Sequence, residues 1–179
     1  MPVAEEQSDR LRRFTHGDLD AFEALFREFQ GEVYHWIVRI VRDPGAAEDL
    51  TIEAFWRIYR AHARFDPKRR FGAWARRIAT NVALDYLKSA RPQESLPTDF
   101  PATASPNPGI QREVRERTER AFHQLPAKLQ VTAILALIEE QPYKEIAEAL
   151  GISVGAVKVR VFRALRILRR ELRVMGIEP

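Results

Sequence analysis

Seven basic side chains follow one another near the end of the sequence, in a tract that begins soon after a glycine and a serine. They are Lys158, Arg160, Arg163, Arg166, Arg169, Arg170 and Arg173. Cations in such a tract suit the phosphates of a nucleic acid, because each contact releases a condensed counterion. A solvated basic face on a packing helix would carry the same residues. The elements that position the tract therefore decide between the two interpretations.

Two helices joined by a tight turn are predicted for this part of the chain. Ile146, Ala147 and Leu150 form an apolar stripe at helical spacing, and Gly151 follows where a helix would stop. Ser153 can cap a second helix, whose apolar residues recur every three or four positions at Val157, Val161, Leu165 and Leu168. Such a pair is a helix-turn-helix, and its second helix enters a major groove. The turn, the cap and the basic tract together favour DNA binding over a solvated face.

A second basic region lies in the middle of the sequence. Residues 64–91 carry a net charge of +6 and residues 154–179 carry +5, which leaves −7 for the rest of a chain whose total is +4. A polyanion is attracted locally, so two basic regions on an otherwise acidic chain indicate two separate contacts.

The middle region combines cations with aromatic residues. Phe65, Phe71 and Trp74 surround a basic loop, and the following helix carries Arg76, Arg77, Asn81 and Lys88. Single-stranded nucleic acid needs this combination, because cations neutralise phosphates while aromatic walls accept unstacked bases. Trp74 is explained more simply as a core residue. For Asn81, reading a base edge and bonding to the backbone both remain open.

Composition limits the remaining function classes. The chain of 179 residues is 45% apolar and 30% charged, as expected for one medium or two small globular domains. It has no cysteine, and its four widely spaced histidines form no ligand pair. The acidic cluster of Glu48, Asp49 and Glu53 is explained by the helix dipole more simply than by a metal. We expect no enzyme, no catalytic residue, no metal and no cofactor, and a cytoplasmic protein without a signal peptide or membrane insertion.

The periodicity predicts an all-α fold of two small helical domains. Helices are expected at 18–30, where Gly31 ends or interrupts the helix, and at 33–41, 46–64, 71–90, 111–124 and 125–139, followed by the helix-turn-helix. Residues 91–110 hold five of the 11 prolines and read as a linker. The predicted domains are 10–90, an N-terminal helix bundle, and 111–173, a C-terminal bundle with the helix-turn-helix.

Four segments in this order resemble the extracytoplasmic-function (ECF) sigma factors, the smallest bacterial sigma subunits of RNA polymerase. The segments are DAFEALF at 20–26, AAEDLTIEAFWRIYRA at 46–61, RFDPKRRFGAWARRIATNVALDYLK at 64–88 and LGISVGAVKVRVFRA at 150–164. The resemblance covers the chain from about residue 18 to residue 172. It implies that domain 10–90 is sigma region 2 and domain 111–173 is sigma region 4.

The resemblance also implies partners and site residues. Region 2 would bind core RNA polymerase and melt the −10 promoter element, and region 4 would read the −35 element, with the clamp and flap of the polymerase and an anti-sigma factor as protein partners. The implied polymerase-binding residues are Glu48, Asp49, Leu50 and Glu53. The implied −10 residues are Phe65, Lys68, Arg70, Phe71 and Asn81, to which the basic helix adds Lys88. The implied −35 readers are Lys158, Val159 and Arg163, to which the cap and the basic tract add Ser153, Arg160 and Arg166.

Two residues depart from the family pattern within these sites. Ile52 occupies a position where the family commonly has glutamine, which changes part of the expected clamp contact. Val159 occupies a reader position that is often polar, so its expected contact is apolar, for example with a thymine methyl group.

Two rival functions remain. A sigma-mimicking adaptor would sequester an anti-sigma factor without binding DNA, and it would be expected to lose the basic residues that this chain keeps. A helix-turn-helix repressor would not explain the basic and aromatic stretch at 65–88. Neither rival binds core polymerase, so co-purification with polymerase separates both from a sigma factor.

Overall fold

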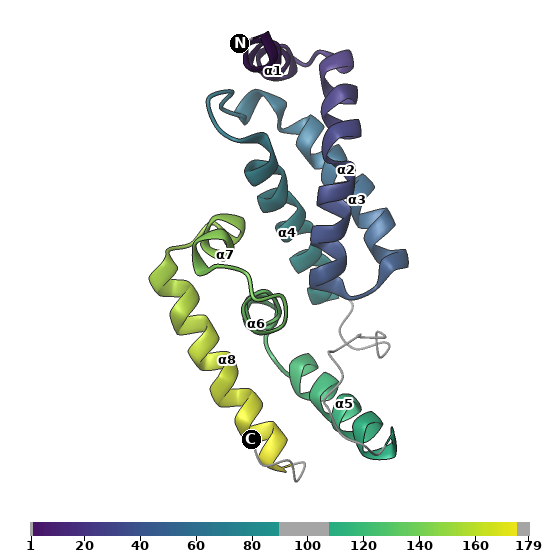
Figure 1. Ribbon diagram of the computed structural model, residues 1–179, viewed down its shortest axis with the longest axis vertical. Coiled ribbons are helices and arrows are strands. Elements are labelled where there is room, and N and C mark those ends of the chain that lie inside the picture. The colour runs from purple at the N-terminus through teal and green to yellow at the C-terminus, as the bar shows by residue number, and fades with distance from the viewer. Residues whose placement is uncertain (1, 90–107, 175–179) are drawn as a thin grey trace. The chain divides into compact units, whose positions relative to one another are not determined.

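The computed structural model describes residues 2–89 and 108–174, and every regular element in these ranges is helical (Figure 1). The elements are α1 (Pro2–Thr15), α2 (Leu19–Val41), α3 (Pro44–Arg60), the 3-10 turn η1 (His62–Arg64), α4 (Phe71–Ser89), α5 (Pro108–His123), α6 (Ala127–Ala133), the π-helical η2 (Ile134–Ile138), α7 (Tyr143–Leu150) and α8 (Val154–Val174). The predicted all-α fold is confirmed. The predicted linker lies outside the described residues up to residue 107.

The chain divides into two compact units, Met1–Asp85 and Tyr86–Pro179, and the division falls inside α4. The predicted limits of 10–90 and 111–173 remain a prediction. Helix α1 begins before the first of these limits, at Pro2.

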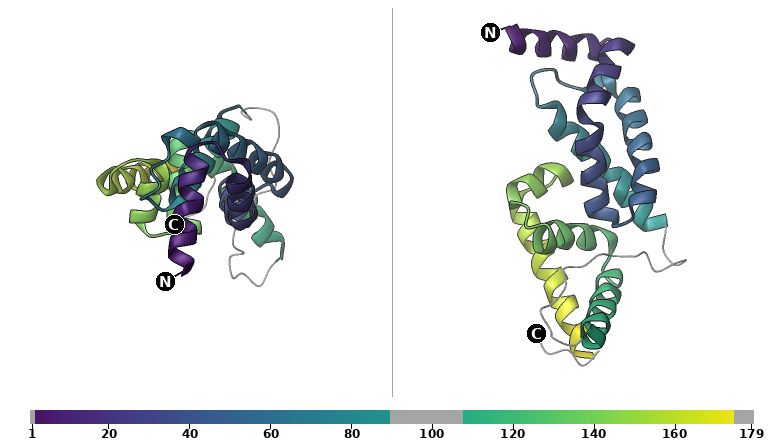
Figure 2. Two further views of the ribbon diagram at one scale, coloured as in Figure 1. Left: turned by 90° about the horizontal axis from the view of Figure 1, so that it is seen from above. Right: turned by 45° about the vertical axis from the view of Figure 1, so that its right-hand side comes forward.

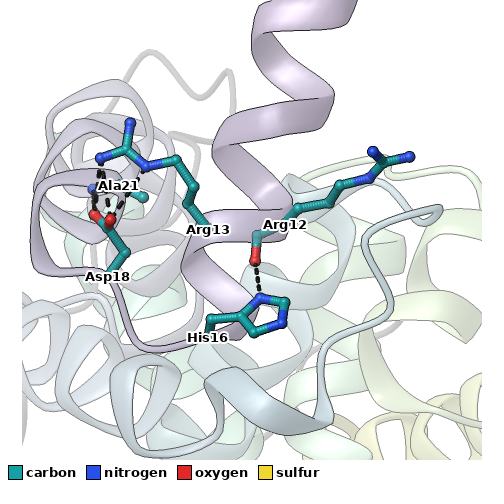
Figure 3. Close-up of polar contacts among 5 residues, drawn as sticks. All are labelled: Arg12, Arg13, His16, Asp18 and Ala21. Carbon is teal, nitrogen blue, oxygen red and sulfur yellow. Dashed lines mark hydrogen bonds and ion pairs between the residues drawn. The ribbon is translucent and has the colours of Figure 1, made fainter.

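Helix α1, which the sequence pattern did not predict, runs across the end of the pair formed by α2 and α3 (Figure 2). It ends in a turn in which Gly17 takes φ +81°, a backbone conformation that residues other than glycine rarely adopt. A Cβ at Gly17 would also meet the His62 ring at 3.2 Å. His16 closes the last turn, with Nδ1 2.8 Å from the Arg12 carbonyl oxygen (Figure 3).

Asp18 caps the start of α2. The Ala21 amide donates to Asp18 Oδ1 at 2.8 Å, and the Arg13 guanidinium donates to both carboxylate oxygens at 3.1 Å (Figure 3). These bonds favour the charged carboxylate, so the Ala21 amide first and then Arg13 lower the pKa of Asp18. The same carboxylate thereby joins the end of α1 to the beginning of α2.

Helix α2 is longer than predicted. It continues through Gly31, although glycine in a helix interior costs roughly 0.5–1 kcal/mol relative to alanine. The continuation buries Val33, Trp36 and Ile37, so packing outweighs the local preference. The predicted break at Gly31 was therefore wrong, and one helix replaces the two expected at 18–30 and 33–41.

Phe14 of α1 is the centre of an aromatic core in the N-terminal unit. Its side chain is fully buried, and five rings lie with centroids 5.6–6.3 Å from its own. These rings belong to Phe22, His62, Phe65, Phe71 and Trp74. Such edge and offset contacts add about 0.5–1.5 kcal/mol per pair to the burial itself. Helix α1 is thus part of the N-terminal core.

In the C-terminal unit, α5, α6 and α7 each pack against α8 (Figure 1). The core includes Phe122, Leu125 and Ile134 packed with Ala164 and Leu168 of α8. The helix predicted at 125–139 is present, but its second half is the π-helix η2. η2 ends at Ile138, and Glu140, two residues further on, has a φ of +49°, which is unusual for a residue with a side chain.

The helix-turn-helix is confirmed in detail. Gly151 ends α7 at φ +64°, and the Ser153 hydroxyl accepts a hydrogen bond from the Ala156 amide at 3.1 Å. Val157, Val161 and Leu168 of α8 are buried, as their spacing predicted. Across the residues with assigned structure, none of the helices combines the length and the apolar character that a membrane span needs.

Candidate nucleic-acid interface

The solvent-facing side of α8 is basic. Lys158, Arg163 and Arg166 are exposed, and Arg160 is half-buried. None of these four side chains forms an ion pair within residues 2–89 and 108–174. Ser153 is exposed as well, but its hydroxyl is engaged in the helix cap. The charges on this face are therefore available to phosphates and base edges.

Two apolar side chains interrupt this basic face. Val159 is 50% exposed and Phe162 is 66% exposed. Val159 was predicted as an apolar reader, whereas Phe162 was not singled out. Phe162 lies outside the apolar stripe of Val157, Val161, Leu165 and Leu168, and this position was the sequence signal for its exposure.

In the N-terminal unit, the residues expected to contact the −10 element do not share one environment. Lys68 and Arg70 are exposed on the loop before α4, and neither forms an ion pair with any described residue. Phe65 and Phe71 are only 4% and 3% exposed. Their placement differs from the expected solvent-facing aromatic walls, because Phe14 packs against both rings. In this conformation the two rings support the loop from beneath.

Asp66 holds the loop in shape. Its Oδ1 accepts a hydrogen bond from the Lys68 amide at 3.0 Å, and its main-chain oxygen accepts one from the Arg69 amide at 2.9 Å. The carboxylate also lies 3.7 Å from Arg69 Nε. This local turn directs consecutive cations to the surface immediately before the first turn of α4.

Asn81 is exposed in the middle of α4. The exposed Arg77 lies one turn before it on the same side, and the half-buried Ile78 lies next to that side. Trp74 is half-buried in the aromatic core, as the simpler explanation held. Lys88 is exposed near the end of α4. An exposed amide beside an apolar surface can contact a base, and it can donate a hydrogen bond to the base edge or accept one from it.

Helix α3 presents a different kind of surface. Glu48 and Asp49 are exposed, and Leu50 is half-buried. Ile52 and Trp56, one turn apart, are 66% and 56% exposed and form an apolar strip beside the two carboxylates. The apolar residue at 52 was noted only as a departure from a family pattern, and Trp56 was missed.

Glu53, the fourth residue expected to bind polymerase, is bonded within the unit. Its carboxylate accepts from Arg57 Nε at 2.7 Å, and Arg57 also donates to Asp85 of α4 at 2.9 Å. The hydrogen bond that Arg57 donates to Glu53, and then the one that it donates to Asp85, raise the pKa of Arg57. Glu53 therefore contributes to the connection between α3 and α4. Among the described residues, no three acidic or histidine side chains are arranged to hold a metal ion.

Two family models match the chain in the order of its two units. Residues 25–93 match Sigma-70 region 2, and residues 115–168 match Sigma-70 region 4. The gap between the two matches, residues 94–114, contains most of the proline-rich segment.

Three curated relatives align over nearly their whole lengths. RNA polymerase sigma factor CarQ of Myxococcus xanthus is 32% identical, over 94% of this chain and 98% of that protein. The ECF RNA polymerase sigma-E factor of Escherichia coli (strain K12) is 30% identical, over 90% of this chain and 93% of that protein. The ECF RNA polymerase sigma factor SigW of Bacillus subtilis (strain 168) is 29% identical, over 92% and 95%.

Solved structures agree with the fold. CnrH, in complex with the cytosolic domain of CnrY, has a TM-score of 0.58 at 24% identity and covers 94% of this chain and 97% of that chain. The sigma factor RpoE of Bartonella quintana, in complex with the anti-sigma factor NepR, has a TM-score of 0.51 at 18% identity and covers 86% and 97%. With both regions matched and two relatives at least 30% identical over 90% or more of the chain, this chain belongs to the ECF sigma factors of the sigma-70 family.

Proposed function

We propose that this chain directs transcription initiation by binding core RNA polymerase and recognising the −10 and −35 promoter elements with its two units. The proposal depends above all on one observation, the exposed basic face of α8, where Lys158, Arg163 and Arg166 have no ion-pair partner among the described residues. The relatives that are RNA polymerase sigma factors support the same function. We assign no catalytic residue, and we place the protein in the cytoplasm, where polymerase and promoter DNA are found.

In the C-terminal unit, α8 enters the major groove of the −35 element. Lys158, Val159 and Arg163 contact base edges, with Arg163 suited to guanine and Val159 to a thymine methyl group. Arg160 and Arg166 contact phosphates. Ser153 acts through the helix cap, which fixes the start of α8 against the DNA.

In the N-terminal unit, Asn81 holds a base that has left the −10 duplex. Lys68 and Arg70 contact the phosphates of the opened strand, and Lys88, near the end of α4 and beyond Asp85, contributes a further cation. Phe65 and Phe71 act indirectly, because they are buried and hold the basic loop in place. Binding of an exposed base offsets the few kcal/mol that unstacking costs, which is how a protein without ATP can open DNA.

Helix α3 binds the clamp of core polymerase. Glu48 and Asp49 provide charge at the rim of the contact, while Ile52 and Trp56 provide its apolar centre. Leu50 and Glu53 support this face from positions that are partly buried. Exposed tryptophan is a frequent anchor of protein interfaces. Other partners proposed for this chain are the polymerase flap and an anti-sigma factor, in line with the sigma factor RpoE, whose structure contains the anti-sigma factor NepR.

Reconstitution with core polymerase tests this function. The full chain should co-purify with core polymerase, and the complex should start transcription from a promoter selected from genomic DNA of the source organism. Trp56→Ala should weaken retention by core polymerase, whereas Phe162→Ala, at a ring on α8 that is at least as exposed, should leave it unchanged. A chain that binds duplex DNA but is not retained by core polymerase would refute the sigma function.

A further inference from the structure

A groove of about 450 Å³ lies beside the basic loop, and Asn81, the residue assigned above to the flipped base, does not line it. Leu11 of α1 and Phe29 of α2 contribute apolar surface, and Phe71 and Gly72 contribute the start of α4. Lys68 and Arg70 line the same groove. Cations around a hollow that is partly apolar suit an unstacked nucleotide, because they bind its phosphates while the apolar surface contacts its base.

This groove is separate from the surface that presents Asn81. Gly72 and Arg76 line the groove from α4. At about 100° per residue, Asn81 lies about 180° around the helix from Gly72 and about 140° from Arg76. The loop of Lys68 and Arg70 therefore has a candidate nucleotide surface on each of its two sides.

Among the described residues that line the groove, Glu32 is the one with an acidic side chain. Its Oε1 lies 3.4 Å from Arg76 Nε, and the Arg76 guanidinium lies 5.5 Å from the centre of the Trp36 ring. Trp36 is itself fixed, because its indole N–H donates to the Thr80 hydroxyl at 2.9 Å. This chain of contacts from α2 to α4 holds the carboxylate in one place while leaving it about half exposed.

Gly72 allows the carboxylate to sit against the first turn of α4. A Cβ at this position would lie 3.1 Å from Phe29 Cε1, and 3.4 and 3.6 Å from the two carboxylate oxygens of Glu32. The absence of a side chain thus brings the aromatic edge and the carboxylate together over the helix start. An ionised carboxylate only accepts hydrogen bonds, so whatever it reads must donate.

From this geometry we infer that the groove binds one unstacked base that carries an exocyclic amino group, with Glu32 accepting its hydrogen bond. Adenine, cytosine and guanine carry such a group, whereas thymine has none. The one donor on the pairing edge of thymine, its ring N3–H, lies between two carbonyl oxygens, which repel a carboxylate. Lys68 and Arg70 bind the phosphates on either side of this base. The inference rests on the proposed function, since the base belongs to the promoter strand that the holoenzyme opens.

Selection on pre-melted DNA tests this inference. Holoenzyme made from core polymerase and the full chain is bound to a promoter bubble whose opened non-template strand is randomised, and the retained strands are sequenced. We expect wild type to disfavour thymine at one position by about tenfold, as a good side-chain contact to a base provides. Glu32→Gln should remove this preference at that position alone, because its amide can also donate to a thymine carbonyl.

Two further variants serve as controls. Glu28 lies one turn before Glu32 on α2 and is also ion-paired, with Arg10, but it does not line the groove. Holoenzyme with Glu28→Gln should therefore select the same bases as wild type. Asn81→Ala should change the preference at a different position. The inference is wrong if Glu32→Gln and wild type select the same bases throughout, or if Glu32→Gln and Asn81→Ala change the same position.

A measurement on the wild-type protein does not depend on how the variants fold. At the position where thymine is disfavoured, the preferred base is replaced by its analogue without the amino group, namely purine for adenine, pyrimidin-2-one for cytosine or hypoxanthine for guanine. Holoenzyme affinity should fall about tenfold. An unchanged affinity would overturn the inference but leave the sigma function intact, whereas failure to form holoenzyme would refute the proposed function itself.

Discussion

The two basic surfaces of this protein differ in how they are built. On α8, one helix provides all the cations, and its own apolar stripe of Val157, Val161 and Leu168 decides which side faces solvent. In the N-terminal unit, the basic loop rests on Phe65 and Phe71, which are covered in turn by Phe14 of α1. A surface that follows from one helix can be derived from local periodicity. A surface assembled from several segments depends on packing between residues far apart in the sequence.

Among the changes that test this contrast, removal of the Phe14 ring should have the largest effect. We expect Phe14→Ala to destabilise the N-terminal unit by about 3–5 kcal/mol, because a fully buried aromatic side chain is replaced by a cavity. Urea unfolding followed by far-UV circular dichroism measures the loss. Phe162→Ala, which truncates an exposed ring on α8, should change stability by no more than about 0.5 kcal/mol. Equal losses in the two variants would contradict the contrast between a packed and a solvent-facing aromatic side chain.

Within the C-terminal unit, base contacts and phosphate contacts should separate. Arg163→Ala should weaken binding to −35 duplex DNA by about 1–3 kcal/mol and relax selectivity at one base pair. Arg173→Ala, near the end of α8, should weaken binding to all sequences and reduce the salt dependence of the affinity. Titrations at several salt concentrations, with specific and random duplexes, distinguish the two effects. If both variants lose specific and non-specific affinity in the same ratio, the assignment on α8 is wrong.

A smaller effect is expected where the C-terminal backbone is strained. Glu140 has φ +49°, which costs a residue with a side chain roughly 1–2 kcal/mol, so Glu140→Gly should stabilise the protein by about 0.5–1 kcal/mol once chain entropy is included. Glu148→Gly, at an exposed position inside α7, should destabilise it by about 1 kcal/mol. Thermal unfolding of both variants gives the two signs. Destabilisation by Glu140→Gly would show that the left-handed backbone there carries no strain.

The mildest test concerns the junction between α1 and α2. The folded state lowers the pKa of Asp18, so the charged carboxylate stabilises folding at pH values above its ordinary pKa, and this contribution is lost as the pH falls through the lowered pKa. Asp18→Asn keeps a capping side chain without the charge. The difference in stability between wild type and Asp18→Asn should therefore shrink on acidification, as measured by urea unfolding across an acid pH series. A difference that is constant with pH would contradict the role given to the charge.

The helical fold and much of α8 could be predicted from the sequence, and the reasons are local. Gly151 and Ser153 act within a turn, and the apolar stripe of α8 repeats over several turns. Gly31 shows the limit of local rules, because buried residues on both sides of it carry α2 through the glycine. Helix α1 was not predicted because its buried apolar contribution comes from few residues, chiefly Leu11 and Phe14, in a mostly polar segment.

The candidate sites show the same limit. Lys68, Arg70 and Asn81 are exposed, and their residue types sufficed to mark them. That Phe65 and Phe71 are buried could not be predicted, because the residue that covers them lies some fifty positions earlier in the chain. The groove lined by Glu32 and Gly72 depends on the approach of α2 to α4 and has no sequence signature.

Promoter opening by the Asn81→Ala holoenzyme tests the central claim most directly, that the N-terminal unit opens DNA by capturing a base. Permanganate reactivity of unpaired thymines is measured on a duplex promoter, and affinity is measured on the same promoter with a pre-melted −10 bubble. We predict that the variant binds core polymerase and −35 duplex normally but opens the duplex poorly. It should also bind the bubble more weakly, by about 1–3 kcal/mol, with lower selectivity at one base. A variant that is less stable to urea yet opens and selects DNA as wild type does would contradict this account.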